Sequence, residues 1–249
     1  MSSTSIQPTR LALFDIDGTL LTSAGVATAT FSQVLAEVAG RPVPADGYSM
    51  AGKTDPQIVR DLLRRAGLLP QAIDGMVPRV LDRYLERFPA ALAASPRPRL
   101  FPGVRDLLAH LAALPHVLVG LLTGNVERGA AIKLGHFGLG DRFRVGAYGS
   151  DSEDRRALVE VAVRRAEALT GRRFAARDVV VIGDTPLDID CGRAAGALTV
   201  AVATGPYSTD DLEAHHPDAL FRDFAEVERV AEVIAGAAPA APAHRGAGR

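Results

Sequence analysis

Short apolar runs alternate with amphipathic helical patterns between residues 100 and 234 of this 249-residue chain. The runs are rich in Val and Leu, and the stretches between them repeat apolar residues at helical spacing. Strands that are apolar on both faces and are joined by helices are typical of a parallel sheet covered on both sides. The predicted strands are 117–122, 143–147, 179–182, 198–202 and 219–221; the predicted helices are 104–113, 155–169, 187–195, 224–234 and one from Asn125 onward. The pattern therefore predicts an α/β fold.

The region between residues 26 and 94 has a different pattern, because it is helical throughout and contains no convincing strand. Apolar residues recur at helical spacing from Phe31 to Val38 and from Ile73 to Phe88. A helix between them is predicted to begin with Asp55 as its N-cap and to end at Gly67. The sequence thus predicts a helical insertion after the first strand.

The insertion divides the chain into parts. We expect a core made of residues 1–21 and 98–235, a helical cap of residues 22–97, and a tail of residues 236–249. The tail consists largely of Ala, Pro and Gly, and we expect it to be disordered because it has little to bury. Connections near 21–25 and 95–100 would place the cap over the carboxyl ends of the strands, where sites in parallel sheets lie.

Composition narrows the classes of partner. The formal net charge is −1 and the arginines are scattered among acidic residues, so we expect no nucleic-acid partner. No apolar run approaches the roughly 20 residues of a membrane span, and the first ten residues lack an apolar signal core. The single cysteine, Cys191, suits a reducing compartment. We expect a soluble, cytoplasmic protein without a membrane partner, either a monomer or a homodimer.

The first apolar run ends in candidate chemistry. Residues 11–14 lead into Asp15 and Asp17, which alternation along a strand points in the same direction. Gly18 allows a tight turn, and Thr19 offers a hydroxyl group where the chain leaves the sheet. An anion or a metal ion could approach these carboxylates without meeting a bulky side chain.

Three further polar groups follow apolar runs in the same order along the chain. They are Thr123-Gly124-Asn125, Asp154-Arg155-Arg156 at the start of a helix, and Gly183-Asp184-Thr185-Pro186-Leu187-Asp188. With the first run, this ensemble resembles the haloacid dehalogenase-like (HAD) hydrolase superfamily, most closely its phosphoglycolate phosphatase-like members. The resemblance extends from about residue 11 to about residue 224, and four motifs in order are more specific than any one. It implies a Rossmann-like parallel sheet core with an inserted α-helical cap domain.

The resemblance implies roles for the carboxylates. Asp15 would attack phosphorus and form an aspartyl-phosphate, and Asp17 would protonate the leaving alcohol and later deprotonate water. In the family a metal ion is bound by the first Asp, the backbone carbonyl of the second and an Asp of the last motif, which map onto Asp15, Asp17 and Asp184. Asp188 would be an outer ligand or would hold the cationic residue. Mg²⁺ is the expected cofactor because it prefers hard oxygen ligands.

The other motifs would bind a small phosphorylated substrate. The Thr123 hydroxyl would bond a phosphoryl oxygen, Gly124 would permit close approach, and Asn125 would offer further donors. The family usually has a Lys in its third motif, often followed by Pro. This chain has neither, so Arg155 and Arg156 are the candidates, and we favour Arg155.

In the cap, residues 51–55 resemble the family segment that dips toward substrate. Lys53 in this segment could meet a substrate carboxylate or a second phosphate, or could be a surface lysine. A phosphatase is the leading interpretation, and a phosphomutase stays open because transfer to a hydroxyl depends on cap geometry. A phosphonatase would use Lys53 as a Schiff base. A dehalogenase would lack Asp17, and a non-catalytic regulator would have lost an acidic position.

Overall fold

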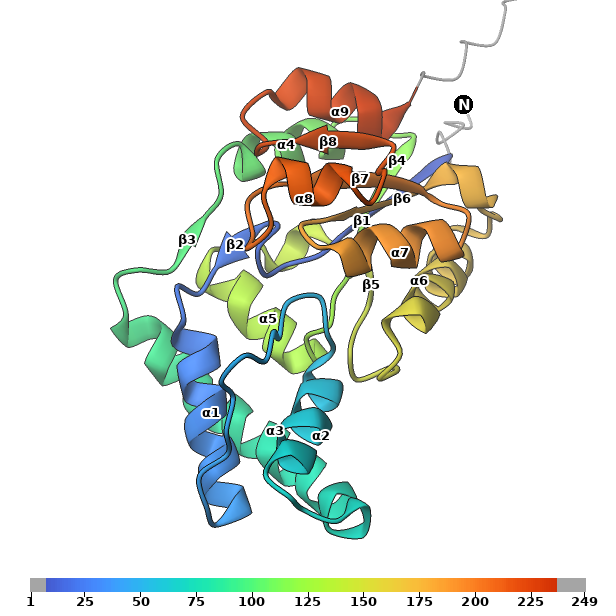
Figure 1. Ribbon diagram of the computed structural model, residues 1–249. Coiled ribbons are helices and arrows are strands. Elements are labelled where there is room, and N and C mark those ends of the chain that lie inside the picture. The colour runs from blue at the N-terminus through green and yellow to red at the C-terminus, as the bar shows by residue number, and fades with distance from the viewer. Residues whose placement is uncertain (1–7, 237–249) are drawn as a thin grey trace, which may run out of the picture.

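Six parallel strands form the central sheet of the protein in a computed structural model that describes residues 8–236 (Figure 1). The strand order is β5-β4-β1-β6-β7-β8. The strands are β1 (Arg10–Phe14), β4 (Val117–Leu122), β5 (Val145–Ala147), β6 (Val179–Gly183), β7 (Leu198–Val202) and β8 (Ala219–Phe221). All five strands predicted beyond residue 100 are confirmed, although β5 begins two residues later than predicted. The α/β fold with a mainly parallel sheet is thereby established.

Helices cover both faces of this sheet, as Figure 1 shows for α4 and α9 on one side and α6 and α7 on the other. Alternation in β1 explains why both faces are apolar: Ala12 and Phe14 pack under the first group of helices, and Leu11 and Leu13 pack under the second. The core helices are α4 (Val104–Ala112), α5 (Glu127–His136), α6 (Arg155–Thr170), α7 (Pro186–Ala194), α8 (Thr209–Glu213) and α9 (Val227–Ala235). The five-residue helix α8 was not predicted, because it is too short to show a helical period.

Three helices inserted after β1 form the cap: α1 (Val26–Ala39), α2 (Asp55–Arg65) and α3 (Pro70–Ala94). They enclose an apolar cluster of their own, in which the Tyr84 ring stacks on Phe88 at 4.9 Å and meets Phe31 edge-on at 5.0 Å. The predicted N-cap of α2 was wrong by one residue. Thr54 is the N-cap and accepts a hydrogen bond from the Gln57 amide.

The two connections between cap and core pair with each other. β2 (Leu21–Thr22) and β3 (Arg99–Leu100) form a short antiparallel ladder in which Leu21 faces Leu100. The sequence predicted the positions of these connections but not their pairing. Because both crossings meet in one small ladder, we propose that the cap pivots there, with boundaries near the predicted residues 22 and 97.

Loss of a large side chain from the apolar cluster of the cap is expected to destabilise the cap helices. Phe88 is fully buried among the cap helices, so Phe88→Ala should destabilise them by about 3–5 kcal/mol. Hydrogen exchange should show faster exchange in α1–α3 while β1 and β6 keep their protection. Leu69→Ala is the control, because Leu69 lies in the cap but is 71% exposed. Equal loss of protection in sheet and cap would contradict a cap that is packed as a separate unit.

No helix among residues 8–236 is long and apolar enough to cross a membrane. The tail predicted to be disordered lies outside the described residues, apart from Gly236.

Cys191 is a buried free thiol that donates to the Arg155 carbonyl oxygen at 3.2 Å, which is consistent with a packing role.

Candidate active site

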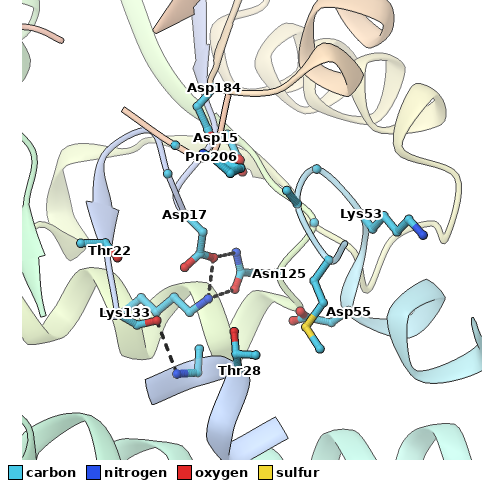
Figure 2. A pocket seen from close by; sticks show the side chains of 18 of the residues that line it. Asp15, Asp17, Thr22, Thr28, Lys53, Asp55, Asn125, Lys133, Asp184 and Pro206 are labelled. Carbon is cyan, nitrogen blue, oxygen red and sulfur yellow. Dashed lines mark hydrogen bonds and ion pairs between the residues drawn. The ribbon is translucent and has the colours of Figure 1, made fainter. Parts of the chain in front are cut away.

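A cavity of about 470 Å³ lies between the carboxyl ends of the strands and the cap (Figure 2). The core contributes Asp15, Asp17 and Asp184 to its lining. The cap contributes apolar side chains such as Phe31 and polar ones such as Thr28. The cavity is therefore acidic at the sheet and of mixed polarity toward the cap.

Three carboxylates meet at the sheet end of this cavity. Asp15, Asp184 and Asp188 each place an oxygen within 4.8 Å of the other two, and all three side chains are buried. Asp15 follows β1 and Asp184 follows β6, and these two strands are hydrogen-bonded neighbours. Asp188 lies in the first turn of α7, where its carboxylate accepts bonds from the amide and the hydroxyl of Thr185. Adjacent parallel strands and a helix N-terminus thus bring together residues that are far apart in the sequence.

One guanidinium group contacts this cluster. Arg155 Nη2 lies 2.5 Å from Asp188 Oδ1 and 3.2 Å from Asp15 Oδ1, and the Arg155 side chain is buried. Arg156 is exposed, so of the two sequence candidates only Arg155 reaches the acids. Nε of Arg155 is buried and lacks a hydrogen-bond partner among the described residues.

The charges of the cluster are not balanced by Arg155 alone. Burial raises the pKa of Asp15 to about 6, although Arg155 opposes this shift. Burial, together with Asp188 and Asp15, raises the pKa of Asp184 well above its usual value. Buried carboxylates that resist ionisation in the absence of a cation are suited to bind a divalent metal ion through hard oxygen ligands.

The turn after β4 holds the second carboxylate of the first motif. Asn125 Nδ2 donates to Asp17 Oδ2 at 2.7 Å and to Thr123 Oγ1 at 2.8 Å. Thr123 is fully buried and is not among the residues that line the cavity. Gly18 has a φ of 83°, and a Cβ atom there would lie 2.2 Å from Asp184 Oδ2. The turn after β1 thus leaves room for Asp184 only with glycine at this position.

Two side chains predicted to contact the substrate are bonded to other residues of the protein. The Thr19 hydroxyl donates to Asp184 Oδ1 at 2.8 Å, so it orients a carboxylate rather than facing the cavity. The Lys53 ammonium lies 3.3 Å from Asp61 Oδ2 and over the Tyr48 ring, and Figure 2 shows it pointing away from the carboxylates. A substrate contact through Lys53, or a Schiff base on it, would require this ammonium to leave its partners within the cap.

The sequence did not reveal Lys133. Its Nζ lies 2.5 Å from Asp17 Oδ2 and 2.5 Å from Asn125 Oδ1 (Figure 2). One signal was present, because Lys133 falls on the same face of α5 as Ala130 and Leu134, which are buried. A lysine at an apolar position of a helix that begins at a polar motif suggests a buried partner.

Asp55 is the second residue whose role was missed. Its carboxylate accepts a hydrogen bond from the Val126 amide at 2.9 Å, and its own amide donates to the Gly124 carbonyl at 2.7 Å. Burial raises the pKa of Asp55 to about 6, although Lys133 opposes this shift. The cap is therefore seated on the very turn that holds Asn125.

Contact between cap and core at this turn is close. A Cβ atom on Gly124 would lie 2.1 Å from the Lys53 carbonyl oxygen. Thr54 Oγ1 also donates to the Glu153 carbonyl oxygen at 3.0 Å. We call this set of contacts, made by Lys53, Thr54 and Asp55 on the Gly124 turn and Glu153, the cap seat.

Comparison with known proteins agrees with this geometry. A family model described as haloacid dehalogenase-like hydrolase matches residues 12–202. A phosphoglycolate phosphatase of Synechococcus elongatus is 31% identical over 84% of this chain and 90% of its own length. A tyrosine-protein kinase, PtkA of Mycobacterium tuberculosis, is 31% identical over 82% of this chain and 65% of its own length. A solved structure of a putative β-phosphoglucomutase of Bacteroides vulgatus shares the fold, with a TM-score of 0.67, 20% identity and coverage of 94% and 93%.

A parallel sheet with an inserted helical cap and a carboxylate cluster at the strand ends forms a Rossmann-like core with a capped acidic site. The chain belongs to the haloacid dehalogenase-like hydrolase family, as an enzyme of the phosphatase type.

Proposed function

We propose that this enzyme is a magnesium-dependent phosphatase that hydrolyses a small phosphorylated metabolite through an aspartyl-phosphate. The observation that carries the proposal is the buried group of Asp15, Asp184 and Asp188 with Arg155, at the end of a 470 Å³ cavity under the cap. A cavity of this size suits a small substrate. The relatives named phosphoglycolate phosphatase support a short phosphorylated acid as its class.

The proposed chemistry uses the residues in two steps. Asp15 attacks phosphorus, the bond from phosphorus to the ester oxygen breaks, and Asp17 gives its proton to the leaving alkoxide. Asp17 then takes a proton from water, whose oxygen attacks phosphorus, and the bond to Asp15 breaks to release phosphate. Arg155 would hold phosphoryl oxygens and offset the charge of Asp15.

The acidic residues also have the composition expected for the metal site. Asp15, the Asp17 carbonyl oxygen and Asp184 would hold Mg²⁺, while Asp188 keeps Arg155 in place. When bound, the ion would neutralise charge on the carboxylates and on the phosphoryl group. Thr19 would act on this site indirectly, by orienting Asp184.

Metal binding is expected to stabilise the protein in a pH-dependent way. Saturating Mg²⁺ should raise the Tm by about 3–8 °C near pH 7.5. The rise should be smaller near pH 5.5, because the pKa of Asp15 in the metal-free protein is about 6 and its proton must leave before the ion binds. Thermal denaturation with and without a chelator measures the effect. The same shift in Asp184→Asn as in the unchanged enzyme would contradict the assigned site.

The function itself is tested by phosphate release. Phosphorylated short acids, sugars and nucleotides are assayed with Mg²⁺ and with a chelator, and ATP is included because one relative is named a tyrosine-protein kinase. Metal-dependent release of inorganic phosphate from a short phosphorylated acid is the expected result. A phosphomutase would instead convert a sugar phosphate to its isomer without net release, and no turnover of any ester would favour a binding protein.

A further inference from the structure

Lys133 is a buried cation of the cavity that the proposed chemistry does not use. Its side chain is only 4% exposed, and its Nζ lies 2.5 Å from Asp17 Oδ2 and from Asn125 Oδ1. Asn125 Nδ2 donates to the same Asp17 oxygen at 2.7 Å. This oxygen therefore receives two donors, one of them charged, and the orientation of the carboxylate is fixed by them.

The cap supplies the rest of the surroundings of the ammonium group. Nζ lies 5.7 Å from the centroid of the Phe88 ring. Burial alone would lower the pKa of Lys133, but Asp17, Tyr84 and Asp55 act in the opposite direction and the pKa is raised. Lys133 thus keeps its charge between one carboxylate of the core and three side chains of the cap.

Removal of the cap would change the strength of this contact. An exposed ion pair between a lysine and a carboxylate contributes little, because water competes for both groups. Under the seated cap the ammonium group is buried while the Asp17 side chain stays 40% exposed, so the attraction is stronger than that of a fully exposed pair. The strength of the ion pair between Lys133 and Asp17 therefore depends on whether the cap side chains Tyr84, Phe88 and Asp55 cover the ammonium group.

We propose that Lys133 is a positioning residue through which seating of the cap orients the Asp17 carboxylate for proton transfer. The inference rests on the acid and base role of Asp17 in the proposed function. A rival interpretation is that Lys133 binds an anionic group of the substrate. The geometry favours positioning, because Nζ already contacts two acceptors at 2.5 Å and little of the side chain is exposed.

The test uses Lys133→Met and two leaving groups. With ethyl phosphate, whose alkoxide needs a proton, kcat/KM should fall by about 30–100-fold, and with p-nitrophenyl phosphate by less than about 3-fold. The comparison uses kcat/KM because it reports steps up to the first irreversible one, here formation of the aspartyl-phosphate. Arg128→Met, which removes an exposed cation from the same helix, is the matched control and should change neither value. Equal losses on both esters would overturn the proposal.

A phosphate ester that carries a carboxylate distinguishes the positioning role of Lys133 from direct binding of an anionic substrate group. Its kcat/KM should fall by the same factor as that of ethyl phosphate if Lys133 acts through Asp17. A loss that is confined to the carboxylated ester would show that Lys133 binds the substrate, and would overturn the positioning role.

A double-mutant comparison distinguishes failure of this inference from failure of the proposed function. Asp17→Asn should lower kcat/KM for ethyl phosphate by about 10²–10³-fold, and adding Lys133→Met should cost less than about 2-fold more. An unaffected Asp17→Asn enzyme would contradict the proposed function. Additive losses would overturn only the inference. If Lys133→Met does not fold, Lys133→Arg is used, because its planar head cannot reproduce both contacts, and a smaller loss with the same leaving-group dependence is expected.

Discussion

Replacing Asp15 by Asn is expected to abolish turnover of every phosphate monoester, with kcat/KM at least about 10³-fold lower. The amide is a poor nucleophile, and it removes one of the three carboxylates that meet within 4.8 Å. Both phosphoryl transfer and binding of the metal ion should suffer. The measurement is release of inorganic phosphate from the best substrate of the panel, in the presence of Mg²⁺.

A second measurement separates chemistry from folding. The ester is labelled in its phosphoryl group, and the reaction is quenched in acid during turnover. The unchanged enzyme should then carry label on the protein, and Asp15→Asn should carry none. Asp141→Asn is the control, since Asp141 is exposed and is not among the residues that line the cavity. The Tm of both variants shows whether they fold. A folded Asp15→Asn enzyme that keeps its activity would eliminate Asp15 as the nucleophile.

The core of this fold could be predicted because its signals are local. The apolar run 179–182 is buried on both faces, and it forms β6 with almost the predicted bounds. β2 and β3 could not be predicted, because they are two residues long and their pairing joins segments on either side of the cap. Helix α8 has one buried residue, Leu212, and so leaves no periodic pattern.

The same distinction applies to the site. Asp15 and Asp184 end neighbouring strands, and residues at strand ends are brought together by the topology of a parallel sheet. Asp55 acquires its contacts where the cap meets the start of α5, and Lys133 reaches Asp17 and Asn125 from within α5, so neither is marked by a motif. The Lys53 ammonium resembles a substrate contact by its position in the sequence, yet it lies with Asp61 inside the cap. Side chains at an interface between two units depend on a docking that no local pattern records.

The second large effect is expected at the cap seat, in Gly124→Ala. The new methyl group would meet the Lys53 carbonyl oxygen at 2.1 Å and the Thr54 Cα at 3.0 Å, so the clash is with the backbone of the cap. The core can keep its structure while the cap cannot settle on the turn. With ethyl phosphate, kcat/KM should fall by about 10²-fold, because water enters the cavity and Asp17 loses its fixed orientation.

The control for this substitution is Gly135→Ala on α5. A Cβ atom there meets nothing within 4 Å, and alanine in a helix should be neutral or stabilising by about 0.5–1 kcal/mol. Faster proteolysis or hydrogen exchange at residues 51–55 in Gly124→Ala, with an unchanged Tm of the core, would indicate an unseated cap. Unchanged activity would mean that the contact seen here is not needed in turnover.

The Gly124→Ala enzyme also tests how the cap acts on the chemistry. If cap seating works through Lys133, then adding Lys133→Met to this variant should lower kcat/KM for ethyl phosphate by less than about 3-fold. The ammonium would already be hydrated, and its loss would remove little from Asp17. A full additional loss would mean that Lys133 holds Asp17 whether or not the cap is seated. In that case closure would contribute mainly by excluding water, and the contacts of Asp55 on the Gly124 turn would serve only to hold the cap down.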